Sequence, residues 1–403
     1  MGKFQFWQKP AETNKIKGSE NRRVTWLELY FDIFFVCAIA AAGHVLVADL
    51  SLEGIKDFVM VFIPIWWIWI GFTFYNERFE TFGIETRLFT FLMMIPVAGL
   101  AVFAHHATGE NFMAFTLSYA LARSILGFLY GRAAFHIKEF RLTGYVYAVC
   151  FAISVIVIVL NALYVPAPIR TVVFGSALAF DLLVPFIATS LDGTFRNPEP
   201  LDLSNKINER FGLFSIIVIG ELIVAIVNGI STMEHPGAND LILGIAGLAV
   251  ALGMWWIYFD FIGRRGADKQ AMKAYAWAYL HMPLVMSFVG LSAGILYSIE
   301  HPGQLESQAR LLIGCASGAT LIFIGLIEWV SHRHPQEPTH HFLSSGIKFV
   351  SGIVLIAMGW YSHFEIVPMV TFIFVVQAIS MSYGLWAWFN VPDDSEYNTD
   401  YAG

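Results

Sequence analysis

The sequence predicts an all-α membrane protein with about twelve transmembrane helices arranged in two six-helix halves. Three observations lead to this prediction: the composition, the length of the apolar runs, and the distribution of Lys and Arg. Of the 403 residues, 57% are hydrophobic and 14% are charged, whereas a soluble globular chain carries about 25% charged residues. So few charges cannot cover a water-facing surface, which argues against an ordinary soluble enzyme, and the apolar richness excludes a disordered chain.

The apolar residues form continuous runs close to the length of about 20 residues that crosses a hydrocarbon core about 30 Å thick. They are not ten-residue alternations of polar and apolar side chains, so they argue against an outer-membrane barrel. In chain order the expected spans are 26–47, 55–75, 86–106, 112–133, 144–164, 170–190, 208–230, 239–262, 274–297, 309–331, 343–362 and 365–389.

These spans divide the chain into five parts. Residues 1–25 form a polar N-terminal segment, and residues 26–190 form the first six-helix half. Residues 191–207 link it to the second half, residues 208–389, and residues 390–403 form an acidic tail. We expect the N-terminal segment, the linker and the tail to be cytoplasmic.

The basic residues fix this orientation. With the N-terminus inside, 20 of the 24 Lys and Arg residues fall on the cytoplasmic side. Only Lys56, Arg170 and Arg310 fall outside, and Arg123 lies within a span. Because cytoplasmic loops carry an excess of Lys and Arg, this asymmetry predicts that both termini are cytoplasmic.

A weak internal repeat relates spans 1–3 to spans 7–9. Residues 64–69 (PIWWIW) resemble residues 253–258 (GMWWIY), and a proline follows the second Trp of each segment, at a separation of 29 and 27 residues respectively. Because a six-span unit is even, its two copies share one orientation. The repeat therefore predicts a pseudo-twofold axis along the membrane normal.

Several ionisable residues fall near the inner ends of spans. Glu28 and Asp32 stand four residues apart, so both carboxylates lie on one helix face. Further candidates are Glu209 and Arg210 at the start of span 7, Glu221 within it, Asp260 at the end of span 8 and His281 in span 9. Such groups in a membrane need a partner or a wet cavity. We interpret these seven residues as a proton, ion or substrate site, with His281 as a relay.

The repeat places Glu28, Asp32, Glu209 and Asp260 at one depth, facing one inner vestibule. This expectation fails if Asp32 and Asp260 each pair with an arginine of their own. The alternative interpretation makes these acids interfacial anchors and helix N-caps, since acids near a helix N-terminus offset its dipole.

A second group lies at mid-depth. The guanidinium of Arg123 stays protonated, so it requires a buried acid, and Asp181 and Glu221 fall at a similar depth. We therefore predict a buried ion pair between Arg123 and Asp181 or Glu221, either structural or part of a substrate site.

Other function classes find little support. The net charge of −7 argues against nucleic-acid binding. Cys37, Cys150 and Cys315 lie in apolar runs without disulfide or metal spacing. The loop containing His332, His334, His340 and His341 could bind metal weakly but reads more simply as a solvated loop. No enzyme motif, resident metal or cofactor is predicted.

Three segments resemble the bacterial low temperature requirement A family. Residues 24–36 (VTWLELYFDIFFV) are similar to its opening signature, residues 209–221 (ERFGLFSIIVIGE) to a second, and residues 255–260 (WWIYFD) to a third. The resemblance implies a polytopic protein of the bacterial inner membrane, named for a growth phenotype in the cold. It implies no particular substrate, reaction or cofactor.

The function predicted from these observations is proton- or cation-coupled transport of an unidentified small solute, with membrane lipid as the other partner. Two alternatives stay open: a membrane-embedded enzyme acting on lipid or a small molecule, and a non-catalytic membrane protein of cold or stress adaptation. Whether the chain forms a homo-oligomer is also left open.

Overall fold

A computed structural model describes residues 7–13, 22–79, 81, 83–193, 204–231, 233, 235–301, 305–334 and 337–390. These residues contain twelve helices that are long and apolar enough to cross a membrane. The predicted fold class, an all-α multi-span membrane protein, is therefore confirmed. The chain divides into two compact units, residues 1–210 and 211–403, and each is described by itself below.

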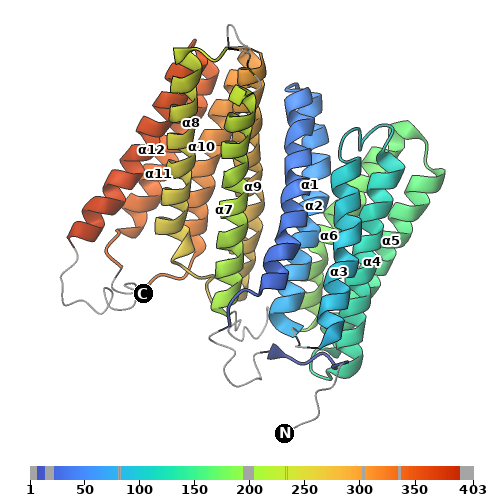
Figure 1. The fold of residues 1–403 in the computed structure, drawn as a ribbon. Helices are drawn as coiled ribbons and strands as arrows, with labels where there is room; N and C mark the ends of the chain where they lie inside the picture. The colour runs from blue at the N-terminus through green and yellow to red at the C-terminus, as the bar shows by residue number, and fades with distance from the viewer. Residues whose placement is uncertain are drawn as a thin grey trace. The chain divides into compact units, whose positions relative to one another are not determined.

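The first unit is a bundle of long helices (Figure 1). Helix α1 packs against α2 and α3, α3 packs against α4, and α4 and α5 share an extensive contact. The helices are α1 (Trp26–Ala48), α2 (Leu52–Phe79), α3 (Ile84–Phe103), α4 (Phe112–His136), α5 (Arg141–Tyr164), α6 (Ala167–Leu191) and the first turns of α7 (Asn205–Ser231).

A capping box starts α1. The Thr25 hydroxyl accepts a hydrogen bond from the Glu28 backbone N–H, and the Glu28 carboxylate accepts one from the Thr25 backbone N–H. These bonds satisfy donors that a helix N-terminus otherwise leaves open. Glu28 thus also serves as the helix cap that the alternative interpretation anticipated.

The second unit contains the rest of α7 and five further helices. They are α8 (Ala238–Tyr258), α9 (Ala271–Glu300), α10 (Ser307–Val330), α11 (His341–Tyr361) and α12 (Ile366–Phe389). Helix α8 continues into a single π-helical turn, η3 (Phe259–Gly263). A lone antiparallel bridge between Ala267 and Ser331 ties the segment after η3 to the end of α10.

Glycines allow α10 and α11 to approach very closely. A Cβ atom built on Gly314 would lie 2.5 Å from the Cα atom of Gly359, and one built on Gly318 would lie 2.4 Å from the carbonyl oxygen of Gly352. Only residues without a side chain fit at these contacts. Small residues at helix interfaces are the usual means of close packing within membranes, where lipid supplies no hydrophobic drive between helices.

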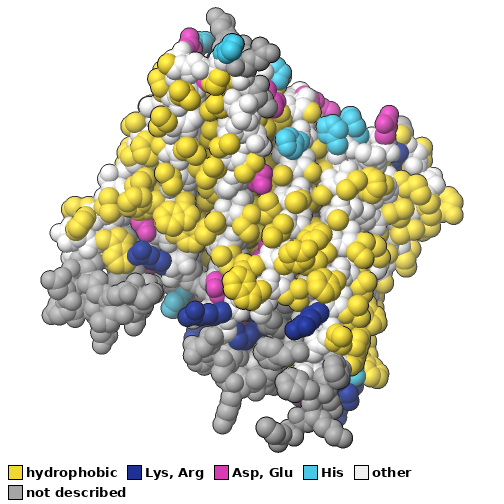
Figure 2. All heavy atoms as spheres, in the orientation of Figure 1, with side chains coloured by type: hydrophobic (Ala, Val, Ile, Leu, Met, Phe, Trp, Pro, Cys, Tyr) yellow, Lys and Arg dark blue, Asp and Glu magenta, His cyan; other side chains and the backbone are white. Residues whose placement is uncertain are grey.

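Charge and hydropathy divide the surface as a membrane protein requires. On the face drawn in Figure 2, apolar side chains cover much of both units, and Lys and Arg side chains gather mainly toward one end. Backbone polar groups in hydrocarbon must be satisfied within a helix, and all of the predicted spans are indeed helical. The observed helix bounds lie within a few residues of the predicted ones.

The internal repeat stays a prediction. The neighbouring pairs α3–α4 and α4–α5 have counterparts in α9–α10 and α10–α11, but α8 packs extensively on α12 whereas α2 meets α6 only briefly. The proposed domain boundaries likewise remain predictions, and residues 1–6, 14–21, 194–203 and 391–403 of the predicted terminal segments and linker lie outside the described residues.

Candidate functional site

Two acids and two bases meet between α1 and the first turns of α7. One Arg210 nitrogen lies 3.0 Å from Glu28 Oε1, and the other lies 3.2 Å from Asp32 Oδ1. Lys206 Nζ lies 2.9 Å from Glu28 Oε2. The indole Nε1 of Trp69 on α2 donates a 2.9 Å hydrogen bond to Asp32 Oδ1. We call these five residues the α1–α7 charge cluster.

Matched helical spacing creates this cluster. Glu28 and Asp32 are four residues apart on α1, and Lys206 and Arg210 are four residues apart on α7. Residues i and i+4 lie on one face of a helix, so each helix presents two like charges, and the two faces neutralise each other. Arg210 spans both carboxylates, while Lys206 contacts only Glu28.

The cluster is buried almost completely. Asp32 is 0% exposed, Arg210 1% and Lys206 2%. A charge in such a place is costly unless it is paired and hydrogen-bonded. The pairing is uneven: Asp32 Oδ1 accepts two hydrogen bonds, whereas no described residue donates to Asp32 Oδ2. This oxygen is a buried acceptor that could bind a proton without losing a hydrogen bond to a described residue.

Glu209 has a different role from its neighbour Arg210. Its side chain is exposed, and its carboxylate accepts a 3.1 Å hydrogen bond from the Val24 backbone N–H, just before α1. It therefore fastens the start of α1 to the start of α7 at the edge of the α1–α7 charge cluster.

Asp260 lies in the second unit, within η3. Its carboxylate accepts a 2.6 Å hydrogen bond from Trp256 Nε1 and lies 3.5 Å from an Arg264 nitrogen. Asp32 and Asp260 are thus each paired with an arginine of their own. That is the condition under which the expectation of one four-acid vestibule fails, so the acids are better described as separate local pairs.

His281 is also held within the second unit. Its Nδ1 lies 2.7 Å from the Trp277 carbonyl oxygen, and its Nε2 lies 3.2 Å from the Tyr258 hydroxyl. A carbonyl oxygen only accepts, so Nδ1 carries a proton and Nε2 is left to accept from Tyr258. Both ring nitrogens of the neutral imidazole are then satisfied. Glu221 is half-buried on α7 and forms no ion pair with a described residue of its unit.

The mid-depth arginine has a partner in the first unit. Arg123 Nε on α4 lies 3.0 Å from Asp181 Oδ2 on α6, and both side chains are at most 1% exposed. The Tyr119 hydroxyl donates a 2.6 Å hydrogen bond to the same oxygen. The Arg123 guanidinium also stacks 3.7 Å from the centre of the Phe151 ring. Of the two acids offered to Arg123 by the sequence, the structure pairs it with Asp181.

Sequence reasoning missed a second buried charge cluster, at the end of α10 and the first turns of α11. Lys348 Nζ lies 2.8 Å from Glu328 Oε2 and 2.9 Å from the Ser344 hydroxyl. Arg265, in the segment after η3, lies 2.8 Å from Glu328 Oε1 and also pairs with Glu337. Although burial by itself lowers the pKa of Arg265, these two carboxylates raise it above the ordinary value.

Among the described residues, no group of three or more His, Cys, Asp or Glu side chains is placed to hold a metal ion. His332 and His334 follow the end of α10, His340 precedes α11, and His341 begins it. Cys37, Cys150 and Cys315 are free thiols.

Comparison with known proteins decides the family. Residues 23–383 match the family described as Bacterial low temperature requirement A protein (LtrA). The chain belongs to the LtrA family. Similarity also extends to an uncharacterized protein of Rhizobium meliloti (strain 1021), which is 27% identical over 391 residues and is matched over 93% of this chain and 88% of its own length. No solved structure matches. The α1–α7 charge cluster lies inside the LtrA match.

Proposed function

We propose that this LtrA-family protein is a proton- or cation-coupled transporter of a small solute in the bacterial inner membrane, with both termini cytoplasmic. The observation that carries the proposal is the buried carboxylate of Asp32, which shares Arg210 with Glu28 and has one oxygen to which no described residue donates. Ionisable groups inside membrane spans often serve as proton relays or ion sites.

The geometry supports a protonation switch. With Glu28 and Asp32 both ionised, two carboxylates face two cations, and the cluster is neutral. A proton on Asp32 Oδ2 would remove one negative charge, so the attraction between Asp32 and Arg210 would weaken. Arg210 would then be held by Glu28 alone, and the contact between α1 and the start of α7 would lose one of its bonds.

Coupling requires such a difference between two states. A proton shifts a conformational equilibrium only if it binds one conformation more tightly than the other. The Arg210–Asp32 interaction is stronger when Asp32 is ionised, so proton binding favours any conformation in which that interaction is already broken. A movement of α1 against the start of α7 at this site would be one way to give alternating access.

The test uses purified protein in proteoliposomes and solid-supported-membrane electrophysiology. Panels of amino acids, organic acids, sugars and amines are applied, and transient currents are recorded over a range of external pH. We expect at least one solute to give a pH-dependent current with the unmodified protein. Asp32→Asn keeps the shape of the side chain and removes its charge, so it should abolish proton coupling.

Glu53→Gln provides a matched control. Glu53 is an acid on an adjacent helix, its side chain is 71% exposed, and it pairs only with Lys56 one helical turn away. Its currents should equal those of the unmodified protein. If Asp32→Asn retains the full pH-dependent current, Asp32 is not the coupling group. If the folded, unmodified protein gives no current with any solute, the transport proposal is contradicted.

A further inference from the structure

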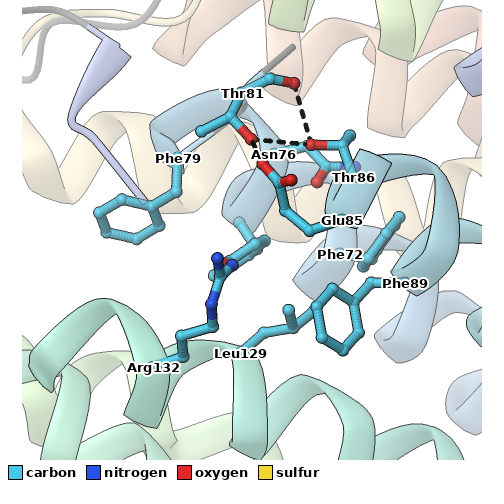
Figure 3. A pocket seen from close by; sticks show the side chains of 10 residues that line it. Phe72, Asn76, Phe79, Thr81, Glu85, Thr86, Phe89, Leu129 and Arg132 are labelled. Atoms are coloured by element: carbon cyan, nitrogen blue, oxygen red, sulfur yellow. Dashed lines mark hydrogen bonds between the residues drawn. The ribbon is translucent and has the colours of Figure 1, made fainter. Parts of the chain in front are cut away.

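The first unit contains a polar pocket between the cytoplasmic-side ends of α2, α3 and α4 (Figure 3). With the N-terminal segment in place, its enclosed space is only about 20 Å³, within about 290 Å³ that includes open solvent, so a ligand would have to displace the segment. Glu85 and Thr86 on α3 face Arg132 on α4 across it, while Phe79 and Phe89 contribute aromatic walls (Figure 3). Glu85 is only 1% exposed. This pocket contains no member of the α1–α7 charge cluster.

The chain's own N-terminal segment is bound at this pocket. The Gln8 backbone N–H donates a 3.0 Å hydrogen bond to Glu85 Oε2, and the Gln8 carbonyl oxygen accepts one from Arg132. Trp7 packs edge-on against Phe89, with a centroid separation of 6.2 Å, and lies 5.4 Å from the Arg132 guanidinium. The acid Glu85 and the base Arg132 therefore bind the backbone N–H and the carbonyl oxygen of the same residue, Gln8.

Residues 12 and 13 fasten the other end of the segment. Glu12 lies 3.2 Å from an Arg78 nitrogen, and the Thr13 hydroxyl donates to the carbonyl oxygens of Glu77 and Arg78 at the end of α2. The segment is thus held at two places, and between them Lys9 and Ala11 are exposed whereas Pro10 is buried. Release of Gln8 alone would uncover the pocket while the second attachment keeps the segment nearby.

The spacing of the two bonds identifies a ligand class. The N–H and the carbonyl that Glu85 and Arg132 bind are separated by one Cα atom. The ammonium and the carboxylate of a free α-amino acid have the same separation. In such a ligand both bonds would join full charges, and charge-assisted hydrogen bonds are roughly twice as strong as neutral ones. Phe79, Phe89 and Leu129 would surround an apolar side chain.

We propose that this pocket binds zwitterionic α-amino acids with apolar side chains, and that Gln8 occupies it as an internal substitute for the ligand. Glu85 binds the ammonium group and Arg132 the carboxylate. The ligand and the N-terminal segment compete for one place. The inference does not rest on the proposed transport, because it concerns binding alone.

Two variants of the full-length protein separate ligand binding from self-occupancy. Gln8→Pro removes the backbone N–H that Glu85 accepts, since proline has none. Gln8→Ala is the matched control, because it keeps both backbone groups. Equilibrium binding of radiolabelled L-phenylalanine is measured in detergent by scintillation proximity. If the segment occupies the pocket for about nine-tenths of the time, Gln8→Pro should bind about tenfold more tightly than the unmodified protein. Gln8→Ala should bind like the unmodified protein.

Two analogues test the ligand class. Phenethylamine lacks the carboxylate, and 3-phenylpropionate lacks the ammonium group, so each should compete poorly with L-phenylalanine. Glu85→Gln is nearly isosteric and should weaken L-phenylalanine binding while the protein still elutes as a folded species in size-exclusion chromatography. No binding of L-phenylalanine to folded Gln8→Pro would overturn the proposal. Equal competition by either analogue would overturn the amino-acid class, and equal affinity of Gln8→Pro and Gln8→Ala would overturn self-occupancy.

Discussion

Arg210 on α7 donates a hydrogen bond to Asp32 on α1, and the two residues are 178 positions apart in the chain. The bond joins the first predicted signature segment to the second. It shows why two acids near the start of α1 can be buried. The neutralising charges come from two basic residues near the start of α7, which are also four residues apart.

Removing Arg210 should destabilise the protein more than removing its partner as well. Arg210→Met leaves Glu28 paired with Lys206 and Asp32 without a cation, bonded to the Trp69 indole, and an uncompensated buried charge costs about 3–5 kcal/mol. Adding Asp32→Asn should restore part of that loss, because one negative charge disappears. The measurement is the fraction of protein that stays monodisperse after heating in detergent. Arg87→Met, at an exposed position of α3, is the control and should behave like the unmodified protein.

The Arg123–Asp181 pair should show the same coupling at mid-depth. Among the described residues, Arg123→Met leaves Asp181 with the Tyr119 hydroxyl as its one side-chain donor. Folded yield should therefore fall by an amount consistent with a loss of about 3–5 kcal/mol in stability. The double change Arg123→Met with Asp181→Leu should recover much of the yield, since apolar replacement of a whole buried pair is often neutral. A double variant whose loss equals the sum of the two single losses would show that the two residues act independently.

The sequence predicted those parts of the fold that depend on local patterns. Twelve apolar runs gave twelve helices because span length is fixed by membrane thickness, and a protonated arginine at mid-span required a buried acid. The prediction grouped Glu28 and Asp32 correctly on one face because helical spacing alone decides it. It could not identify Lys206 or Trp69 as their partners, because no local pattern reports which helices pack together.

Lys348 and Asp260 show why the partners of buried charges could not be predicted from the sequence. Lys348 was counted among cytoplasmic basic residues that set the topology, yet its side chain is buried against Glu328. The acid that neutralises it lies 20 residues earlier, on another helix. Asp260 was grouped with Asp32 by analogy between two weakly similar segments. In the structure it has a local partner, Arg264, four residues along the chain.

The contact between α10 and α11 should not tolerate a methyl group. Gly318→Ala would place a Cβ atom 2.4 Å from the Gly352 carbonyl oxygen, so the helices must separate. We expect a loss of about 1–3 kcal/mol from overpacking, larger than the gain of about 1 kcal/mol that alanine brings to a helix. Gly346→Ala on α11 meets nothing within 4 Å and should be neutral or stabilising. Thermal unfolding of both variants in one detergent checks the difference, and equal midpoints would refute the close contact.

Both chain termini should lie in the cytoplasm. The basis is the excess of Lys and Arg on one side of the predicted spans, together with an even number of helices. A fluorescent reporter that matures only in the cytoplasm, fused after residue 403, should be active, and a phosphatase that requires the periplasm should be inactive there. A phosphatase fused in the loop between α1 and α2, after Leu50, serves as the positive control. Phosphatase activity at residue 403 would exclude the topology.

Lys348 and Glu328 should behave as one buried unit. Lys348→Met leaves the Glu328 carboxylate paired with Arg265 but without its 2.8 Å bond to Lys348. The free energy of unfolding should therefore fall, by up to about 3–5 kcal/mol if Arg265 cannot compensate, and folded yield should fall with it. Adding Glu328→Gln removes the unmatched negative charge while its amide oxygen can still accept from Arg265, so stability should partly return. Lys56→Met is the control. It breaks the exposed pair between Lys56, whose side chain is 60% exposed, and Glu53, so it should change stability by less than about 1 kcal/mol.

If Lys348→Met is as stable as Lys56→Met, the second charge cluster contributes nothing to folding. If the double variant is no more stable than Lys348→Met alone, Lys348 acts through its packing on the Phe261 ring, 3.3 Å from its Nζ, rather than through its charge.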